Sequence, residues 1–300
     1  MKTQNAPSLS RTAQWPGRIK AFTFNDLLAV LLVLAILAAL VLPALAATKG
    51  RELTTSCLNN LRQLQVAYHL YAEDFNDLIV LNQKGEGSSS NWVSGVMSGG
   101  GNGSAGIPTD PTDYVLLEEG LLYAYCKHTT IYKCPADTGL NPQSLMPTVR
   151  SYSINCYMNG FDVAQDAGLI PNPTPPGYYA VQTRLSQVSS PPPANRIVFV
   201  DESAGSIDDG QYATPPTGGN NIYGYGPIDF WLNHPTARHN NGAVFSFADG
   251  HTVSHAWLGT QLQQWDATNF IGNDRNPVNG PDLIDLQWVQ AGMALPAGQN

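Results

Sequence analysis

The sequence predicts an α+β fold in which a long N-terminal transmembrane helix continues into a globular head with an antiparallel β-sheet. Three observations lead to this prediction. An uncharged apolar run occupies residues 27–47, and an amphipathic helical stripe follows it. Further along the chain, short apolar runs bounded by turn residues are typical of strands.

The composition limits the kind of protein. Charged residues make up 13% of the 300 residues, about half the share found in typical soluble proteins. The 15 Lys and Arg are outnumbered by 23 Asp and Glu, which gives a formal net charge of −8. This acidic balance provides no basic surface for nucleic acid, so no nucleic-acid partner is predicted.

Four segments differ in charge and pattern. Residues 1–21 form a basic leader with four Lys and Arg and no acid. Residues 22–47 form the predicted transmembrane or filament helix, because 21 uncharged residues at about 1.5 Å each span a bilayer core. Basic residues before this span favour a cytoplasmic N-terminus and an exported remainder. Residues 48–76 continue the helix, and residues 77–300 form the extracytoplasmic head.

Two other interpretations of the apolar run stay open. Ala44-Leu45-Ala46 is similar to the cleavage site of a secretory signal peptide, although the apolar region of such a peptide is usually about 7 to 15 residues long. A helix buried in a globular core is the remaining interpretation.

The junction between leader and apolar run reads Lys20-Ala-Phe-Thr-Phe-Asn-Asp-Leu-Leu28. It resembles the prepilin-type cleavage and methylation segment of type IV pilins and type II secretion pseudopilins, such as the major pseudopilin G. In that family a small residue, nearly always Gly, precedes the cut, a Phe opens the mature chain, an acid lies four residues further on, and a Pro follows at the twenty-second mature position. The matching residues here are Ala21, Phe22, Asp26 and Pro43. Ala in place of Gly and Asp in place of Glu depart from the family pattern.

The resemblance implies how this segment is processed and used. A prepilin peptidase and N-methyltransferase would cut after Ala21 and methylate Phe22. A carboxylate in hydrocarbon costs several kcal/mol unless something compensates it, and in the family the neighbouring subunit's N-terminal amine does so. Asp26 would therefore pair with Phe22 of an adjacent chain and set the stagger of helices in a filament. The alternative is that Asp26 extends to the cytoplasmic interface and has no partner.

The predicted helix continues past the apolar run to about residue 76, with a kink at Pro43. Its second half carries an apolar stripe at spacings of three and four residues, formed by Cys57, Leu61, Leu64, Tyr68, Tyr71 and Phe75. The stretches 57–64 and 71–74 resemble a subgroup of large pseudopilin-like proteins, whose C-terminal part carries an H-X9-DG domain.

The head is predicted to consist of loops, short helical turns and strands. Residues 85–106 and 171–193 are rich in Gly, Ser or Pro and are predicted to be surface loops. Residues 114–127 predict two short helical turns interrupted at Gly120. The run Ile-Val-Phe-Val at residues 197–200 predicts a central strand.

The segment from His239 to Gly250 matches the H-X9-DG signature in full. Apolar runs flank Asp249-Gly250, a pair that favours a two-residue type I′ turn with positive φ at both positions. A hairpin is therefore predicted within residues 239–257. In the structural interpretation Asp249 shapes this turn, and His239 caps the sheet or packs against it.

A calcium site is the functional alternative for this region. Major pseudopilins, which this chain resembles, bind calcium in a C-terminal loop through oxygen ligands. The candidate ligands come from five acidic residues, namely Asp201, Glu202, Asp208, Asp209 and Asp249. No EF-hand spacing is present, and no other cofactor is predicted.

Enzymatic motifs are missing from the sequence. It contains no G-x-S-x-G, H-E-x-x-H, C-x-x-C or Walker motif, so no enzyme is predicted. A metal-assisted hydrolase built from His234, His239, His251 and His255 is the alternative. Against it, His251 and His255 would share one strand face, where His residues are more often solvated.

Four cysteines follow the apolar run, at positions 57, 126, 134 and 156. In an oxidising compartment they could form two disulfides by three connectivities, which the sequence does not distinguish. Cys57 could also be a small buried apolar residue. No close Cys/His spacing indicates zinc.

The sequence thus predicts a structural subunit, a pseudopilin of a type II secretion or type IV pilus-like apparatus. It would cross the bacterial inner membrane once and act with the processing peptidase and with other pseudopilins or copies of itself. The alternative is a membrane-anchored surface module that binds glycans or secreted substrates through loops such as residues 221–226 and does not polymerise.

Overall fold

A computed structural model covers the chain and describes seven stretches of it. They are residues 23–82, 91–97, 112–141, 145–160, 181–214, 229–268 and 278–293. Ala21 and Phe22, and with them the predicted cleavage site, lie outside these stretches, as does the loop at 221–226. The chain divides into two compact units, Met1–Thr48 and Lys49–Asn300.

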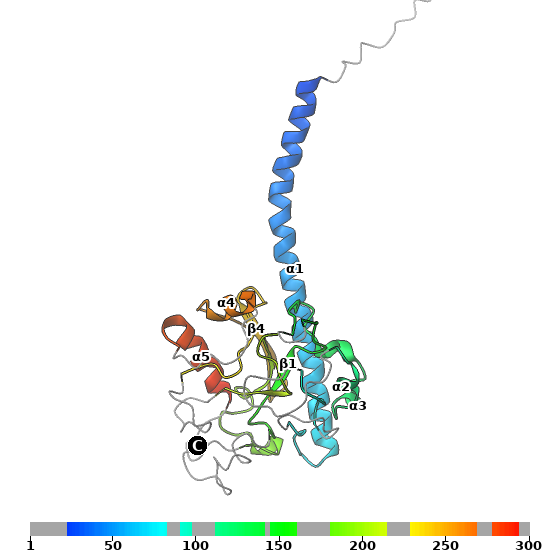
Figure 1. Cartoon of the computed structure of the whole chain (residues 1–300), viewed down its shortest axis with the longest axis vertical. Coiled ribbons are helices and arrows are strands. Elements are labelled where there is room, and N and C mark those ends of the chain that lie inside the picture. The colour runs from blue at the N-terminus through cyan, green and yellow to red at the C-terminus, as the bar shows by residue number, and fades with distance from the viewer. Residues whose placement is uncertain are drawn as a thin grey trace, which may run out of the picture. The chain divides into compact units, whose positions relative to one another are not determined.

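Helix α1 (Phe24–Asp74) contains 51 residues and runs through both units (Figure 1). Its first part, Phe24–Leu42, is apolar and long enough to cross a membrane, and no residue of it is buried within the protein. By length and composition, membrane anchors and signal sequences both have helices of this kind. The helix continues through Pro43, and the structure describes only the backbone of residues 43–47.

The second part of α1 is amphipathic, as predicted. The stripe residues from Cys57 to Tyr71 are all buried, whereas Phe75 is 48% exposed and stacks on Tyr71 at 4.4 Å between ring centroids. The prediction that Phe75 belongs to the buried stripe is therefore wrong. The helix ends at Asp74 because Asn76 and Asp77 adopt positive φ angles of 55° and 71° and turn the chain away.

Five strands form one sheet in the order β3-β1-β2-β4-β5. The strands are β1 (Tyr152–Asn155), β2 (Ile197–Asp201), β3 (Gln211–Tyr212), β4 (Gly242–Phe247) and β5 (Thr252–Ala256). Strand β2 is central and fully buried, which confirms the prediction for the run at 197–200.

The sheet is mixed, so the prediction of an antiparallel sheet is wrong at one edge. Neighbouring strands are antiparallel from β1 through β2 and β4 to β5, but β3 pairs with β1 in parallel. The chain reverses after β2 and passes to the far side of β1. Since β3 then runs opposite to β2, it must run in the same direction as β1.

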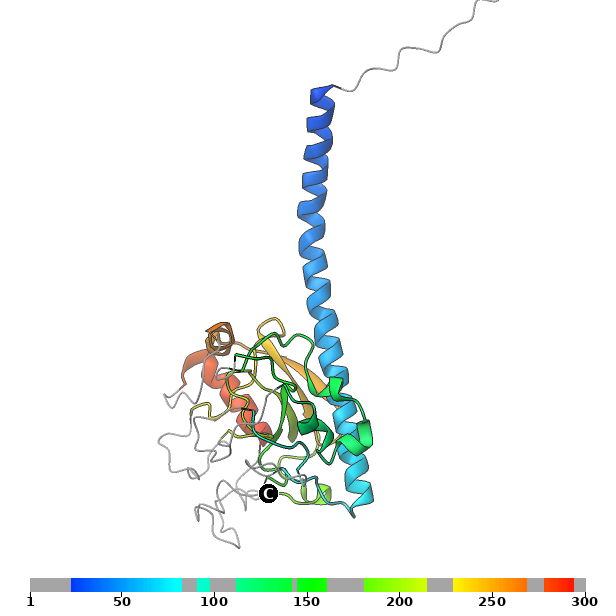
Figure 2. The ribbon, with the colours of Figure 1, turned by 45° about the vertical axis from the view of Figure 1, so that its right-hand side comes forward.

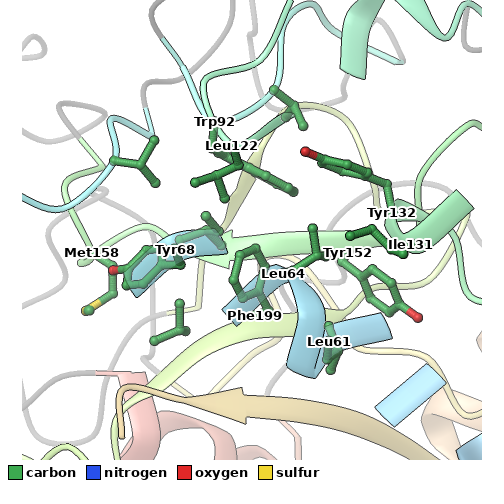
Figure 3. Close-up of a cluster of buried hydrophobic side chains, with 14 of the residues drawn as sticks. Leu61, Leu64, Tyr68, Trp92, Leu122, Ile131, Tyr132, Tyr152, Met158 and Phe199 are labelled. Atoms are coloured by element: carbon green, nitrogen blue, oxygen red, sulfur yellow. The ribbon is translucent and has the colours of Figure 1, made fainter. Parts of the chain in front are cut away.

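Each face of the sheet is covered by a different helix (Figure 2). The face toward α1 is packed with residues such as Leu64, Tyr68 and Phe199, and Figure 3 shows these side chains meeting. The opposite face packs against α5 (Gly280–Met293) through residues such as Phe245 and Leu286. The short helix α4 (Gln261–Thr268) adds Leu262 and Trp265 to that second core.

Part of the predicted surface loop at 85–106 is buried. Trp92 is fully buried, and its indole Nε1 donates hydrogen bonds to Asn82 Oδ1 at 3.1 Å and to the Gly210 carbonyl at 3.0 Å. A large aromatic residue in a Gly- and Ser-rich segment therefore anchors residues 91–97 in the core. For this part the surface prediction is wrong.

The two helical turns predicted at 114–127 are confirmed as α2 (Val115–Glu118) and α3 (Tyr123–Cys126). Gly120 lies between them against Trp92, and a Cβ at this position would clash with the Trp92 carbonyl. Two short 3-10 turns complete the described elements, η1 (Thr129–Tyr132) and η2 (Leu185–Gln187).

We predict that Leu64→Ala lowers the free energy of unfolding by about 2–5 kcal/mol, because it leaves a cavity between α1 and the sheet. Val66→Ala is the matched control, since Val66 lies on the same helix but is 54% exposed; its effect should stay below about 0.5 kcal/mol. Denaturant titration of the full chain in detergent, followed by tryptophan fluorescence, measures both. Equal effects of the two substitutions would show that this face of α1 is not part of the core.

Candidate functional site

The H-X9-DG segment lies against the second part of α1, and we call residues 239–250 the docking segment. At its start, His239 Nδ1 lies 3.1 Å from Thr54 Oγ1. Near its end, His69 Nε2 donates to the Ala248 carbonyl at 3.0 Å. Thr54 and His69 are about 22 Å apart along the helix axis. The docking segment therefore holds α1 over four helical turns.

A hydroxyl in the middle of the docking segment joins three elements. Ser246 Oγ in β4 donates to Gln65 Oε1 of α1 at 2.8 Å and accepts the backbone N–H of Phe199 in β2 at 3.1 Å. The register between β2 and β4 shifts in this region, between Ile197 and Val200. Buried polar groups require hydrogen-bond partners. Ser246 provides one for the backbone N–H of Phe199, beside the register shift, and one for the buried side chain of Gln65.

His239, the first residue of the motif, is buried between three segments. Its Nε2 lies 2.9 Å from Asp201 Oδ2 at the end of β2 and 3.4 Å from Cys134 Sγ. Its Nδ1 faces Thr54, whose hydroxyl also lies 3.0 Å from the Gly50 carbonyl. The predicted structural role is refined, since His239 bridges β2, α1 and the segment containing Cys134.

A buried ion cluster surrounds this histidine. Arg238 pairs with Asp137 at 2.9 Å and lies 3.7 Å from Asp201, while Lys133 pairs with Asp137 at 3.1 Å. Burial raises the pKa of the Asp201 carboxyl, and Arg238 and His239 oppose this shift. Burial acts in the same direction on Asp137, but Arg238, Lys133 and a hydrogen bond from Ser151 outweigh it and hold the pKa of Asp137 below its ordinary value.

A pocket of about 340 Å³ opens beside the ion cluster, and Asp137, Arg238 and Asp266 contribute to its wall. Asp266 already accepts hydrogen bonds from the hydroxyls of Ser203 and Thr236, both at 2.5 Å, and Arg238 is held by Asp137. The charged groups of this wall therefore have partners within the protein.

The Asp-Gly end of the motif forms the loop between β4 and β5. The Gly250 N–H donates to the Phe247 carbonyl at 2.9 Å, and Gly250 has φ +97° while Asp249 does not adopt positive φ. The predicted two-residue type I′ turn is therefore wrong, because the loop has three residues with Gly in the left-handed position. Asp249 Oδ1 accepts the His251 N–H at 3.1 Å, and hydrogen bonds from His251 outweigh partial burial and lower the pKa of Asp249.

The five candidate calcium ligands lie in different environments. Glu202 accepts hydrogen bonds from Ser206 and Asn233, both at 2.8 Å, and burial raises the pKa of Glu202 to about 8. Asp208 and Asp209 cap backbone amides of the turn before β3. The fully buried Arg150 faces these three acids and supplies a positive charge of the protein's own.

The other two candidate calcium ligands, Asp201 and Asp249, lie in other parts of the head. Asp201 belongs to the ion cluster, and Asp249 contacts His251 in the hairpin loop. Within the described stretches, the five carboxylates form no group of closely spaced ligand atoms. Calcium binding therefore stays a prediction from the resemblance.

The four histidines considered for a metal-assisted hydrolase are also separated. His234 packs on Trp265, His251 stacks on Phe247, and His255 stacks on Trp288 at 3.7 Å. Only His239, among the residues whose positions the structure describes, belongs to a group of close metal-ligating atoms, and its companions are Cys57 and Cys134.

The structure selects one of the possible disulfides. Cys57 of α1 bonds to Cys134, 77 residues away, while Cys126 and Cys156 take part in no disulfide. Spacing could not identify the proximity of this disulfide to His239, because the three residues come from distant segments. The one sequence signal for the disulfide was the position of Cys57 on the apolar stripe, which predicts that its sulfur atom lies in the core.

At the other end of α1, Asp26 takes part in the helix cap. Its Oδ2 accepts the N–H and the hydroxyl of Thr23, both at 2.8 Å, and its own N–H donates to Thr23 Oγ1 at 3.3 Å. This reciprocal arrangement is that of a capping box. The sequence predicted for Asp26 an intermolecular partner or none, whereas its partner in the structure is the neighbouring Thr23.

Comparisons with known proteins yield no relative. No protein-family model matches the chain, and neither the curated proteins nor the solved structures contain a match.

We predict that His234 makes stability depend on pH. Burial lowers the pKa of His234 to about 4 from 6.5. Between these values the unfolded chain binds the proton more strongly, so the free energy of unfolding falls as the pH drops, by up to about 1.4 kcal/mol per pH unit. His234→Phe should remove this part of the slope, whereas the exposed His128→Phe should keep it. Denaturant titrations from pH 4 to 7 measure the slopes, and identical slopes for wild type and His234→Phe would contradict the prediction.

Proposed function

We propose that this chain is a prepilin-type structural subunit, a pseudopilin of a type II secretion or type IV pilus-like apparatus. The observation on which the proposal rests is the junction Lys20–Leu28, which is followed by one continuous helix with two different halves. In this proposal a prepilin peptidase cuts after Ala21 and methylates Phe22. The N-terminus faces the bacterial cytoplasm and the head lies outside the inner membrane.

The exposed apolar part of α1 supports this assignment. From Phe24 to Leu42 no side chain is buried by the rest of the protein. An apolar surface of this size is normally covered by lipid or by another protein. In a pseudopilin this helix contacts lipid in the membrane before assembly and packs against neighbouring helices after assembly.

The cap at Asp26 is compatible with a second role in assembly. Both bonds from Thr23 reach Oδ2 of the carboxylate. The amine of Phe22 from a neighbouring subunit would approach Oδ1. The carboxylate would then be compensated by the cap in the membrane and by the amine in the filament, which addresses the cost of a charge at the edge of hydrocarbon.

The second half of α1 supports the structural role. A subunit that assembles through the first half of a helix must hold its head firmly on the second half. Here the docking segment and the Cys57–Cys134 disulfide connect this half to the head. His239 of the motif therefore acts in holding the helix, and no catalytic role is assigned to the motif residues.

We predict that the mature protein begins at methylated Phe22. Intact mass and N-terminal sequencing of full-length protein from a membrane that contains a prepilin peptidase measure this directly. Ala21→Leu should block the cut, because a bulky residue precedes the scissile bond, and Ala46→Leu should leave the product unchanged. A wild-type chain that begins at Met1, or one cut after Ala46, would overturn the proposed function.

A further inference from the structure

The disulfide between Cys57 and Cys134 lies against a histidine. Both sulfur atoms and His239 Nε2 lie within 4.8 Å of one another, and all three residues are buried. The residues come from α1, from the segment after η1 and from the start of the docking segment. Their grouping is a product of the fold.

We propose that reduction of this disulfide creates a zinc site with Cys57, Cys134 and His239 as ligands. Thiolate and imidazole groups are the ligands of structural zinc sites, at about 2.3 Å and 2.0 Å from the metal. Two such ligands on one tetrahedral ion are about 3.5 Å apart. The 3.4 Å between Cys134 Sγ and His239 Nε2 matches this separation.

The two sulfur atoms must move apart for zinc to enter. In a disulfide they are about 2 Å apart, and on one zinc ion about 3.7 Å apart. The difference of roughly 1.7 Å is within the reach of small χ1 rotations of Cys57 and Cys134. The backbone of α1 can therefore keep its position on the sheet.

The surroundings of His239 orient it for metal binding. The Thr54 hydroxyl donates its single hydrogen to the Gly50 carbonyl at 3.0 Å, so its oxygen can accept Nδ1–H of His239 at 3.1 Å. In the oxidised chain Nε2–H can donate to Asp201 Oδ2 at 2.9 Å, and on metal binding zinc takes the place of that proton while Nδ1–H stays on Thr54. Partners of this kind on the outer nitrogen are usual for metal-binding histidines.

Asp201 is the carboxylate beside this group, although its oxygens do not lie within 4.8 Å of all three ligand atoms. Its Oδ2 is 2.9 Å from His239 Nε2, and it is fully buried. A rotation of the Asp201 side chain toward the sulfur atoms would close the site with a fourth protein ligand. Zinc with two thiolates, one imidazole and this carboxylate carries one net negative charge, and Arg238 lies beside Asp201.

The chemical step is a two-electron reduction followed by proton release. A thiol or phosphine reductant supplies two electrons, the S–S bond breaks, and each sulfur takes up one proton from solvent. Zinc then displaces both thiol protons, and two Zn–S bonds form. After loss of zinc, a disulfide oxidant takes up two electrons and two protons from the thiols and the S–S bond re-forms, so α1 is linked to the segment at Cys134 in both redox states.

Metal binding by the full chain in detergent tests this proposal, and it is independent of the proposed function. The oxidised protein and protein reduced anaerobically with a phosphine are each desalted after incubation with Zn²⁺, and bound zinc is measured by mass spectrometry. We expect about one zinc per reduced chain and at least a tenfold lower content in the oxidised chain. Co²⁺ in place of Zn²⁺ should give the visible absorption of a tetrahedral site and a sulfur-to-cobalt band in the near ultraviolet.

Variants assign the ligands. His239→Gln and Cys57→Ser should each lower the affinity of the reduced chain for Zn²⁺ at least tenfold. The control Cys126→Ser with Cys156→Ser should keep it, because these thiols lie outside the group. The cobalt spectrum of the wild type gives a result even if a ligand variant fails to fold. Absence of metal from the reduced protein, an octahedral cobalt spectrum, or loss of binding in the control would overturn the proposal.

Discussion

The contact between the apolar stripe of α1 and the central strands of the sheet is the constraint on which the rest of the structure depends. Leu61, Leu64 and Tyr68 are fully buried there. A helix of this length gains most of its stability from such packing, since isolated helices are marginal in water. The docking segment and the disulfide contact the same helix, and Trp92 belongs to the same core.

Polar groups hold this apolar contact in one register. Gln65 is buried in the helix face, and its Oε1 accepts a hydrogen bond from the Ser246 hydroxyl at 2.8 Å. Near the start of the amphipathic half, His239 is also a buried polar side chain with partners, since its ring nitrogens lie beside Thr54 of α1 and Asp201 of β2. Buried charges contribute little net stability, but removing one partner leaves another without compensation. We infer that these residues select the register of α1, while the apolar stripe supplies the stabilising free energy.

Local patterns predicted much of this fold. The stripe from Cys57 to Tyr71, the central strand at 197–200 and the hairpin all follow from periodicity within one segment. The parallel pairing of β3 and the burial of Trp92 were missed, and the disulfide from Cys57 to Cys134 stayed open among three connectivities, because each depends on contact between distant segments. At the candidate site, the motif predicted structural roles for His239 and Asp249, but only the fold shows that His239 contacts Thr54 of α1 and that Asp249 contacts His251. The Asp26 cap was local and was missed because Thr23 was not considered as a partner.

Hydrogen–deuterium exchange of the full chain in detergent measures how firmly α1 is held on the sheet. If α1 is an integral part of the head, the amides of residues 57–71 should exchange only when the whole head unfolds, as slowly as those of β2. Rapid exchange of residues 57–71 while β2 stays protected would contradict the account, because it would show that the helix can leave the sheet without unfolding the head.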